Sequence, residues 1–155
     1  MKKFYLTKQG LENLKKNYEI LKELRRIKIQ GGVPEILESE DLNPEYLSYS
    51  EDINLLDSKL FELKNILENT EIIKKPSLEK QNIIDFGATV VVGIDGQEDE
   101  FMIVDPLESN PSLGKISSES PVGKALLGHK VGDEVIISSP IKIVYRIKKV
   151  KYDSL

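Results

Sequence analysis

Apolar residues in the first half of the chain recur at helical spacing. After a possible N-cap at Thr7, they step by three, four and three along one helix face: Leu11, Leu14, Tyr18 and Leu21. The next position in this rhythm is Arg25, and the sequence Gly31-Gly32-Val33-Pro34 follows it. Because glycine and proline are poor helix residues, the pattern predicts a first helix that ends near Gln30.

A second apolar stripe predicts a partner for this helix. Its members are spaced as in the heptads of a coiled coil: Ile53, Leu56, Leu60, Leu63 and Leu67. Asn43 followed by Pro44 is typical of an N-cap and a first helical residue, which places Glu45 in the first turn. Because isolated helices are marginal in water, we expect the two stripes to bury each other in an antiparallel hairpin, with residues 31–50 at its far end.

The second half of the chain changes to strand-like patterns. Residues 74–82 lack an apolar stripe and contain a Lys-Lys-Pro-Ser segment, which is typical of a linker. Strands are predicted at 88–94, 100–104, 115–118, 134–138 and 141–150. Asp95-Gly96 predicts a hairpin turn between the first two of them. Ser120-Pro121 should cap and open a short helix that Gly128 ends.

Together these patterns predict an α+β protein in two parts. An antiparallel α-helical coiled-coil hairpin would occupy residues 1–75, and a small antiparallel β domain with one short helix would occupy 76–155. The chain has no Cys and a single histidine, His129, which excludes disulfides, thiol nucleophiles and multi-histidine metal sites. No apolar run approaches the roughly 20 residues of a membrane-spanning helix, so we expect a cytoplasmic protein without a membrane partner.

Charge is segregated along the first half of the chain. Residues 8–28 hold seven basic and three acidic side chains, whereas residues 29–52 hold seven carboxylates and no Lys or Arg. The net charge of the whole chain is only −4. Because like charges repel, this segregation favours a partner surface or a cation at the acidic end. Solvated helix faces next to an acidic loop would produce the same pattern.

Six segments in the two halves of the chain contain recognisable motifs: Thr7–Leu11, Arg25-Arg26, Glu40–Leu42, Gly87–Val92, Ile116–Gly128 and Gly132–Val135. In this order they resemble the bacterial Gre transcript-cleavage factors. The most specific of these signals is the Ser-Pro helix start followed by Gly-Asp-Glu-Val. The resemblance covers essentially the whole chain.

The resemblance implies both a fold and an activity. The C-terminal part would be an FKBP-like domain that docks at the rim of the secondary channel of bacterial RNA polymerase, with Ser120 and Pro121 on the docking edge. The coiled-coil hairpin would reach inward and bring its acidic tip toward the catalytic magnesium. There the tip carboxylates help the polymerase hydrolyse the 3′ end of a backtracked nascent RNA. The polymerase would be the nuclease, and we expect this chain to be a monomer that acts as an accessory factor.

Asp41 is the residue that matches the first tip carboxylate of the family. The resemblance implies that Asp41 binds a second Mg²⁺ or orients the water of that ion. Two-metal phosphodiester hydrolysis needs such an oxygen ligand, and we expect the ion to be shared with the polymerase, not bound stably by this chain alone. Arg25 and Arg26 are candidates for contacts with RNA phosphates or the channel wall, with a solvated helix face as the alternative.

The tip departs from the family pattern. Between Leu42 and Glu45-Tyr46 the chain is two residues shorter, so the second essential glutamate has no single counterpart. Glu45 or Glu40 could take its place, and Glu45 is favoured because it precedes Tyr46 as in the family. Two other functions stay open. One is a Gre homologue that occupies the channel and inhibits the polymerase, and the other is a prolyl isomerase, which the few aromatic residues of the β domain disfavour.

Overall fold

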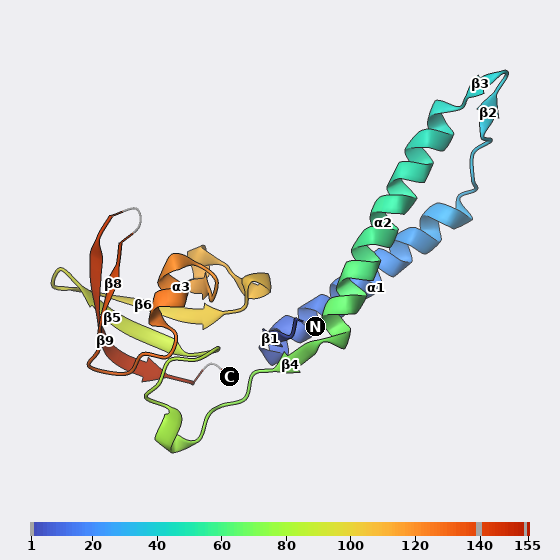
Figure 1. Ribbon diagram of the computed structural model, residues 1–155. Helices are drawn as coiled ribbons and strands as arrows, with labels where there is room; N and C mark the ends of the chain where they lie inside the picture. Colours follow the sequence, from blue (N-terminus) through green and yellow to red (C-terminus); the bar gives the residue numbers. More distant parts are fainter. Residues whose placement is uncertain (1, 139–140, 154) are drawn as a thin grey trace. The chain divides into compact units, whose positions relative to one another are not determined.

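The computed structural model describes residues 2–138, 141–153 and 155. Two long helices, α1 (Lys8–Gln30) and α2 (Pro44–Glu68), run side by side in opposite directions (Figure 1). This arrangement confirms the predicted antiparallel hairpin. In the described part of the chain, no helix combines the length and the apolar character that a membrane span requires.

The two predicted apolar stripes are partly shielded from solvent in this helical pair. Their members are half-buried: Leu11, Leu14, Tyr18 and Leu21 on α1, and Ile53, Leu56, Leu60, Leu63 and Leu67 on α2. Beyond Leu21 the seam becomes polar, where Arg25 contacts Asp57 and Lys28 contacts Asp52 across the pair. Because each helix of a two-helix pair covers only one side of its partner, these stripes keep part of their surface in water.

Both helices begin at their predicted caps. The Thr7 hydroxyl accepts a hydrogen bond of 3.0 Å from the backbone N–H of Gly10. Asn43 Oδ1 accepts one of 3.0 Å from the N–H of Glu45, and Pro44 is the first residue of α2. These caps satisfy backbone N–H groups that have no partner within the helix. The predicted starts of both helices, and the end of α1 at Gln30, are confirmed.

The second unit is built on a five-stranded sheet. Its strand order is β7 (Lys115–Ser117), β6 (Gln97–Val104), β5 (Thr89–Ile94), β9 (Ile143–Lys151) and β8 (Glu134–Ile137). The β5–β6 hairpin turns at Asp95 and Gly96, whose φ angles of 47° and 81° match the predicted two-residue turn. Each predicted strand is present, with ends shifted by at most three residues.

One strand pairing corrects the prediction of an antiparallel sheet. β7 runs parallel to β6, with Met102 opposite Lys115 and Val104 opposite Ser117. Between them the chain turns through two 3-10 helices, η2 (Pro106–Glu108) and η3 (Pro111–Leu113), before β7 begins. Parallel pairing needs such a crossover connection, which the sequence pattern marked only as a loop.

The core of the second unit lies between the sheet and the short helix α3 (Pro121–Leu126). It consists of Ile84, Ala88, Val90, Val92, Ile103, Leu126, Val135, Ile137, Tyr145, Ile147 and Tyr152. A Cβ at Gly123 would overlap the carbonyl oxygen of Ser117, so glycine at this position is what lets α3 pack against the backbone at the end of β7. The Tyr152 hydroxyl donates to the carbonyl of Ile83 over 2.5 Å, which satisfies this buried polar group.

A short segment near the start of the chain, residues 4–10, belongs to the second unit. β1 (Phe4–Leu6) pairs with β4 (Thr70–Ile72) in a two-stranded sheet. Contacts group Phe4–Gly10 with Glu71–Leu155, whereas Leu11–Thr70 belongs to the other unit. The predicted division came five residues later in the chain and left residues 4–10 with the hairpin. The predicted linker contains one short 3-10 helix, η1 (Leu78–Lys80).

Candidate functional site

Two short strands form a β-hairpin at the far end of the helical pair, β2 (Leu37–Glu38) and β3 (Asp41–Leu42) (Figure 1). We call residues 37–42 the tip hairpin. Leu37 pairs with Leu42 and Glu38 with Asp41, so Ser39 and Glu40 make the turn. Ser39 has a φ of 58°, in the left-handed region that two-residue hairpin turns use. The apolar pattern did not predict these strands, because two residues are too few to show an alternation.

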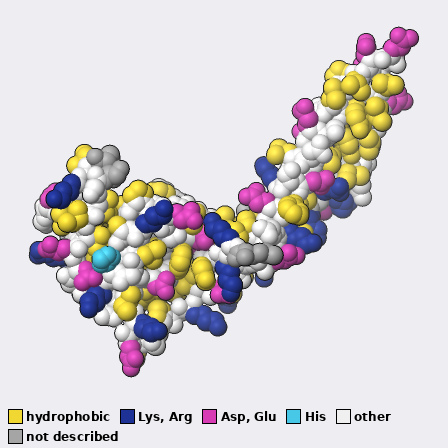
Figure 2. Space-filling view, viewed as in Figure 1, with side chains coloured by type: hydrophobic (Ala, Val, Ile, Leu, Met, Phe, Trp, Pro, Cys, Tyr) yellow, Lys and Arg dark blue, Asp and Glu magenta, His cyan; other side chains and the backbone are white. Residues whose placement is uncertain are grey.

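The tip hairpin brings two carboxylates together. Residues that are paired directly across two antiparallel strands project to the same face, with Cβ atoms about 4.5 to 5.5 Å apart. Glu38 and Asp41 therefore share one face of the tip hairpin, and both are exposed. Figure 2 shows acidic side chains gathered at this end of the helical pair. Glu38 was not among the residues predicted for the site, because only its pairing with Asp41 distinguishes it from other carboxylates nearby.

The two other predicted tip carboxylates occupy separate positions. Glu40 is the second turn residue of the tip hairpin and is exposed. Glu45 is the second residue of α2, where the helix N-terminus favours a carboxylate without any further function. In the described part of the chain, no three carboxylate or histidine side chains are grouped so that they could hold a metal ion. A Mg²⁺ at the Glu38–Asp41 pair would thus take its other ligands from water or from a partner.

Both arginines predicted to contact RNA or the channel wall are engaged in ion pairs. The Nε of Arg25 lies 2.5 Å from Oδ1 of Asp57, and Arg26 contacts Glu23 one turn earlier on α1. The hydrogen bonds that the guanidinium groups donate to these carboxylates raise the pKa of both arginines. The pairs are largely open to solvent and are screened by salt, so a phosphate or a protein wall could replace the carboxylates at small cost.

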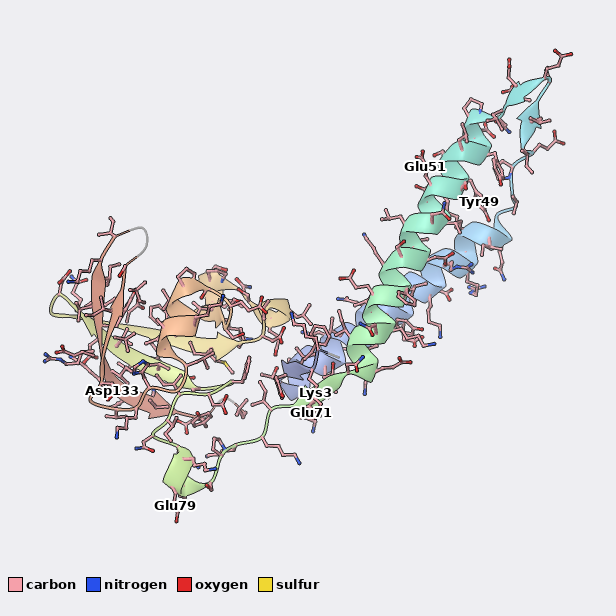
Figure 3. All side chains as sticks on the ribbon, viewed as in Figure 1. Lys3, Tyr49, Glu51, Glu71, Glu79 and Asp133 are labelled. Atoms are coloured by element: carbon pink, nitrogen blue, oxygen red, sulfur yellow. The ribbon has the colours of Figure 1, made fainter. Side chains whose placement is uncertain are left out.

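Tyr49 lies on α2 below the tip hairpin (Figure 3). The ammonium nitrogen of Lys28, on α1, is 5.9 Å from the centroid of the Tyr49 ring. The same nitrogen lies 2.6 Å from Oδ2 of Asp52. A cation near an aromatic ring and an ion pair each contribute modestly at an exposed position. The half-buried ring of Tyr49 thus forms one of the contacts between α1 and α2.

The predicted docking edge lies at the start of α3. The Ser120 hydroxyl accepts a hydrogen bond of 3.1 Å from the N–H of Gly123 and donates one of 2.7 Å to the carbonyl of Ser117. Pro121 occupies the first helical position and is exposed. The predicted cap is confirmed, and it uses the Ser120 hydroxyl internally. Pro121 is the member of the pair that is open to a partner.

Comparisons with known proteins identify the family of this chain. The family described as "Transcription elongation factor, N-terminal" matches residues 4–72, and "Transcription elongation factor, GreA/GreB, C-term" matches residues 79–152. "Transcription elongation factor GreA" of Thermomicrobium roseum is 36% identical over 137 residues, which cover 87% of this chain and 88% of the relative. The protein of the same name from Thermotoga maritima is 40% identical over 144 residues, covering 90% and 91%.

A solved structure gives a further match over nearly the full length. The crystal structure of GreA factor homolog 1 (Gfh1) of Thermus thermophilus is 26% identical, covers 96% of this chain and 99% of its own, and has a TM-score of 0.41. The family assignment rests on the sequence matches, which include both halves of the chain. This chain belongs to the GreA/GreB family of transcription elongation factors.

Proposed function

We propose that this chain is an accessory factor of bacterial RNA polymerase, which binds at the secondary channel and stimulates the polymerase to cleave the 3′ end of a backtracked nascent RNA. Its membership in the GreA/GreB family supports this function. The observation that carries the proposal is the exposed tip hairpin at the end of two long helices, with Glu38 and Asp41 on one face. The polymerase performs the hydrolysis, and the factor acts in the cytoplasm as a monomer.

Asp41 is the central residue of the proposed chemistry. Two metal ions about 3.5 to 4 Å apart stabilise the attacking and the leaving oxygen of a phosphodiester. Mg²⁺ prefers oxygen ligands and keeps its waters unless carboxylates replace them. Asp41 would provide such a ligand, or hold one of the waters, for a second Mg²⁺ shared with the polymerase. Its cross-strand pairing favours Glu38 as the second contributor over Glu40 and Glu45.

Docking would use the second unit of the chain. Pro121 is exposed at the start of α3, and Ser120 keeps that start rigid through its two hydrogen bonds. Arg25 and Arg26 would contact RNA or the channel wall by exchanging their present carboxylate partners for the new surface. Binding would therefore depend mainly on the second unit and cleavage stimulation on the tip hairpin, which makes the two separable by mutation at Asp41.

RNA cleavage in purified, backtracked elongation complexes tests the proposal, with Asp41→Asn compared against Glu51→Gln. Each change removes one exposed carboxylate, and Glu51 lies on α2 away from the tip hairpin (Figure 3). We expect Asp41→Asn to abolish stimulated cleavage while polymerase binding persists, and Glu51→Gln to change neither. Higher Mg²⁺ should partly restore cleavage with Asp41→Asn, because mass action refills a weakened site. Equal stimulation by the parent and Asp41→Asn would refute the function assigned to Asp41.

The shortened tip supports a second candidate function. The segment from Leu42 to Glu45 is two residues shorter than the family pattern, and it continues from a β-hairpin with strands of only two residues. A Gre homologue with such a tip would occupy the secondary channel and inhibit the polymerase. Two results together would decide for this second function: the parent protein does not stimulate cleavage, and it competes with a cleavage-competent Gre factor for the polymerase.

A further inference from the structure

We propose that Asn43 is a positioning residue: it fastens the tip hairpin to the start of α2 and thereby sets where Asp41 and Glu38 are presented. The part of this inference that concerns cleavage rests on the proposed function. The part that concerns the conformation of the tip hairpin stands on the structure alone. Asn43 itself is half-buried and directly follows β3.

Three hydrogen bonds join Asn43 to both sides of the tip. Its side-chain Nδ2 donates to the carbonyl of Glu35 over 2.8 Å, and its backbone N–H donates to the carbonyl of Ile36 over 2.9 Å. Its Oδ1 accepts from the N–H of Glu45 over 3.0 Å. One side chain thus ties the chain that enters the tip hairpin to the helix that leaves it.

Little else in the tip hairpin favours its fold. Strands of two residues are marginal, and the two leucines that pair across them keep 52% (Leu37) and 56% (Leu42) of their surface exposed. On the α1 side, the chain leaves the helix at Gly31 and Gly32, and residues 32–36 are neither helix nor strand. Since apolar burial is small and the α1 side is irregular, the polar anchor at Asn43 carries the placement of the tip hairpin.

The chemistry of an amide side chain explains why asparagine suits this position. Asn donates through nitrogen and accepts through oxygen at the same time, whereas an ionised Asp only accepts. Ser also caps helices well, but its hydroxyl is too short to cap α2 and reach the carbonyl of Glu35 together. Asn43→Ser and Asn43→Asp should therefore keep the cap of α2 and lose the anchor of the tip hairpin.

Nuclear magnetic resonance of the full chain tests the conformational step. Leu37 and Leu42 form the non-hydrogen-bonded pair, whose Hα atoms lie close together in an antiparallel ladder. We expect a strong Hα–Hα Overhauser effect between them in the parent and a marked loss in Asn43→Ser and Asn43→Asp. The amide of Glu45 should stay protected in both variants. The control is Asn54→Ser, on the exposed face of α2, which should leave both the Leu37–Leu42 Overhauser effect and the protection of the Glu45 amide unchanged. A parental Leu37–Leu42 signal in both Asn43 variants would overturn the inference.

Cleavage kinetics test the functional step. With Asn43→Ser, the maximal rate at saturating factor should fall by about tenfold to a hundredfold, since misplacing a group by about 1 Å can cost 10²-fold. The factor concentration at half-maximal rate should not change, because docking lies in the other unit. A merely structural effect would instead change both quantities or neither, and either outcome would overturn the inference.

A second-site change provides the rescue. Ser39 has a φ of 58°, a conformation that glycine adopts more readily, so Ser39→Gly should stabilise the turn without touching Asn43. We expect Asn43→Ser combined with Ser39→Gly to regain part of the Leu37–Leu42 signal and part of the maximal rate together. Recovery of the signal without the rate would overturn the link to cleavage. If the parent does not stimulate cleavage, the proposed function fails, and the Overhauser signals decide the anchoring by Asn43 independently.

Discussion

Gly10→Ala should destabilise the parent protein but stabilise a variant that lacks the Glu108 carboxylate. Glu108 accepts two hydrogen bonds from Thr7, one of 2.8 Å from the backbone N–H and one of 2.5 Å from the hydroxyl. Thr7 is only 8% exposed. A Cβ at Gly10 would overlap the Glu108 carboxyl group. Because that carboxylate ends a flexible side chain, it can move, but only by leaving Thr7.

The magnitudes follow from these contacts. A hydrogen bond to a charged group contributes about 1.5 to 3 kcal/mol, and a buried donor left unpaired costs about 1 to 3 kcal/mol. Glu108 is half-buried and water can replace it in part, so we take about 2 to 3 kcal/mol for losing both bonds. Alanine is favoured over glycine in a helix by up to about 1 kcal/mol. Gly10→Ala should thus cost about 1 to 2 kcal/mol in the parent and stabilise Glu108→Ala by up to about 1 kcal/mol.

A double-mutant cycle measures this coupling. Urea unfolding of the parent, the two single variants and the double variant would be followed by near-ultraviolet circular dichroism, which reports on the buried Tyr145 and Tyr152 of the same unit. The interaction energy should be about 2 to 3 kcal/mol. As a control, Gly31→Ala brings a Cβ no closer than 3.5 Å to its neighbours and should behave alike in both backgrounds. An unchanged cost of Gly10→Ala after Glu108→Ala would show that the carboxylate is not what requires glycine there.

Two further predictions concern the seam and the acid limb of stability. Leu60→Ala should lower the free energy of unfolding by about 1 to 2 kcal/mol, which is below the range for fully buried leucines because Leu60 is half-buried. Thermal unfolding followed by far-ultraviolet circular dichroism should show a lower Tm. The control is the adjacent Phe61→Ala, whose side chain is 78% exposed and which should leave the Tm unchanged. Hydrogen bonds from the Lys130 backbone and His129 lower the pKa of Asp133. The contribution of Asp133 to folding stability is therefore fully present above the ordinary carboxyl pKa of about 3.9, and it is lost as the pH falls through the lowered pKa. Asp133→Asn should therefore flatten the acid loss of stability in urea titrations, and identical acid limbs would contradict this reasoning.

The features that were predictable from the sequence are those set by local chemistry. Thr7 and Asn43 cap helices because a short polar side chain can reach a backbone N–H two or three residues later in the chain. Asp95 and Gly96 turn the β5–β6 hairpin because both tolerate a positive φ. The heptad spacing of apolar residues on α2 predicted a seam with a second helix, because an apolar helix face must be covered. Asp41 was identified through the resemblance to the Gre factors, because Glu40, Asp41 and Leu42 together match the tip motif of that family.

The features that escaped prediction depend on residues far apart in the chain or on very short elements. Glu108 lies about a hundred positions from Thr7, and nothing in its local sequence marks it as the partner of a helix cap. The parallel pairing of β7 depends on the path of a loop, which periodicity does not encode. Glu38 became a candidate only when the register of the tip hairpin placed it opposite Asp41.

The tip hairpin contains several features that disfavour its own fold. Two like charges, Glu38 and Asp41, face each other across the strands, and such pairs are destabilising. On the other face, Leu37 and Leu42 remain more than half exposed, and Ser39 holds a positive φ. Local features that oppose folding are expected where function requires them, and stability must then come from elsewhere. Under the proposed function, a Mg²⁺ shared with the polymerase would replace the repulsion between the carboxylates by coordination, and the tip hairpin would be more stable in that complex than in the free factor.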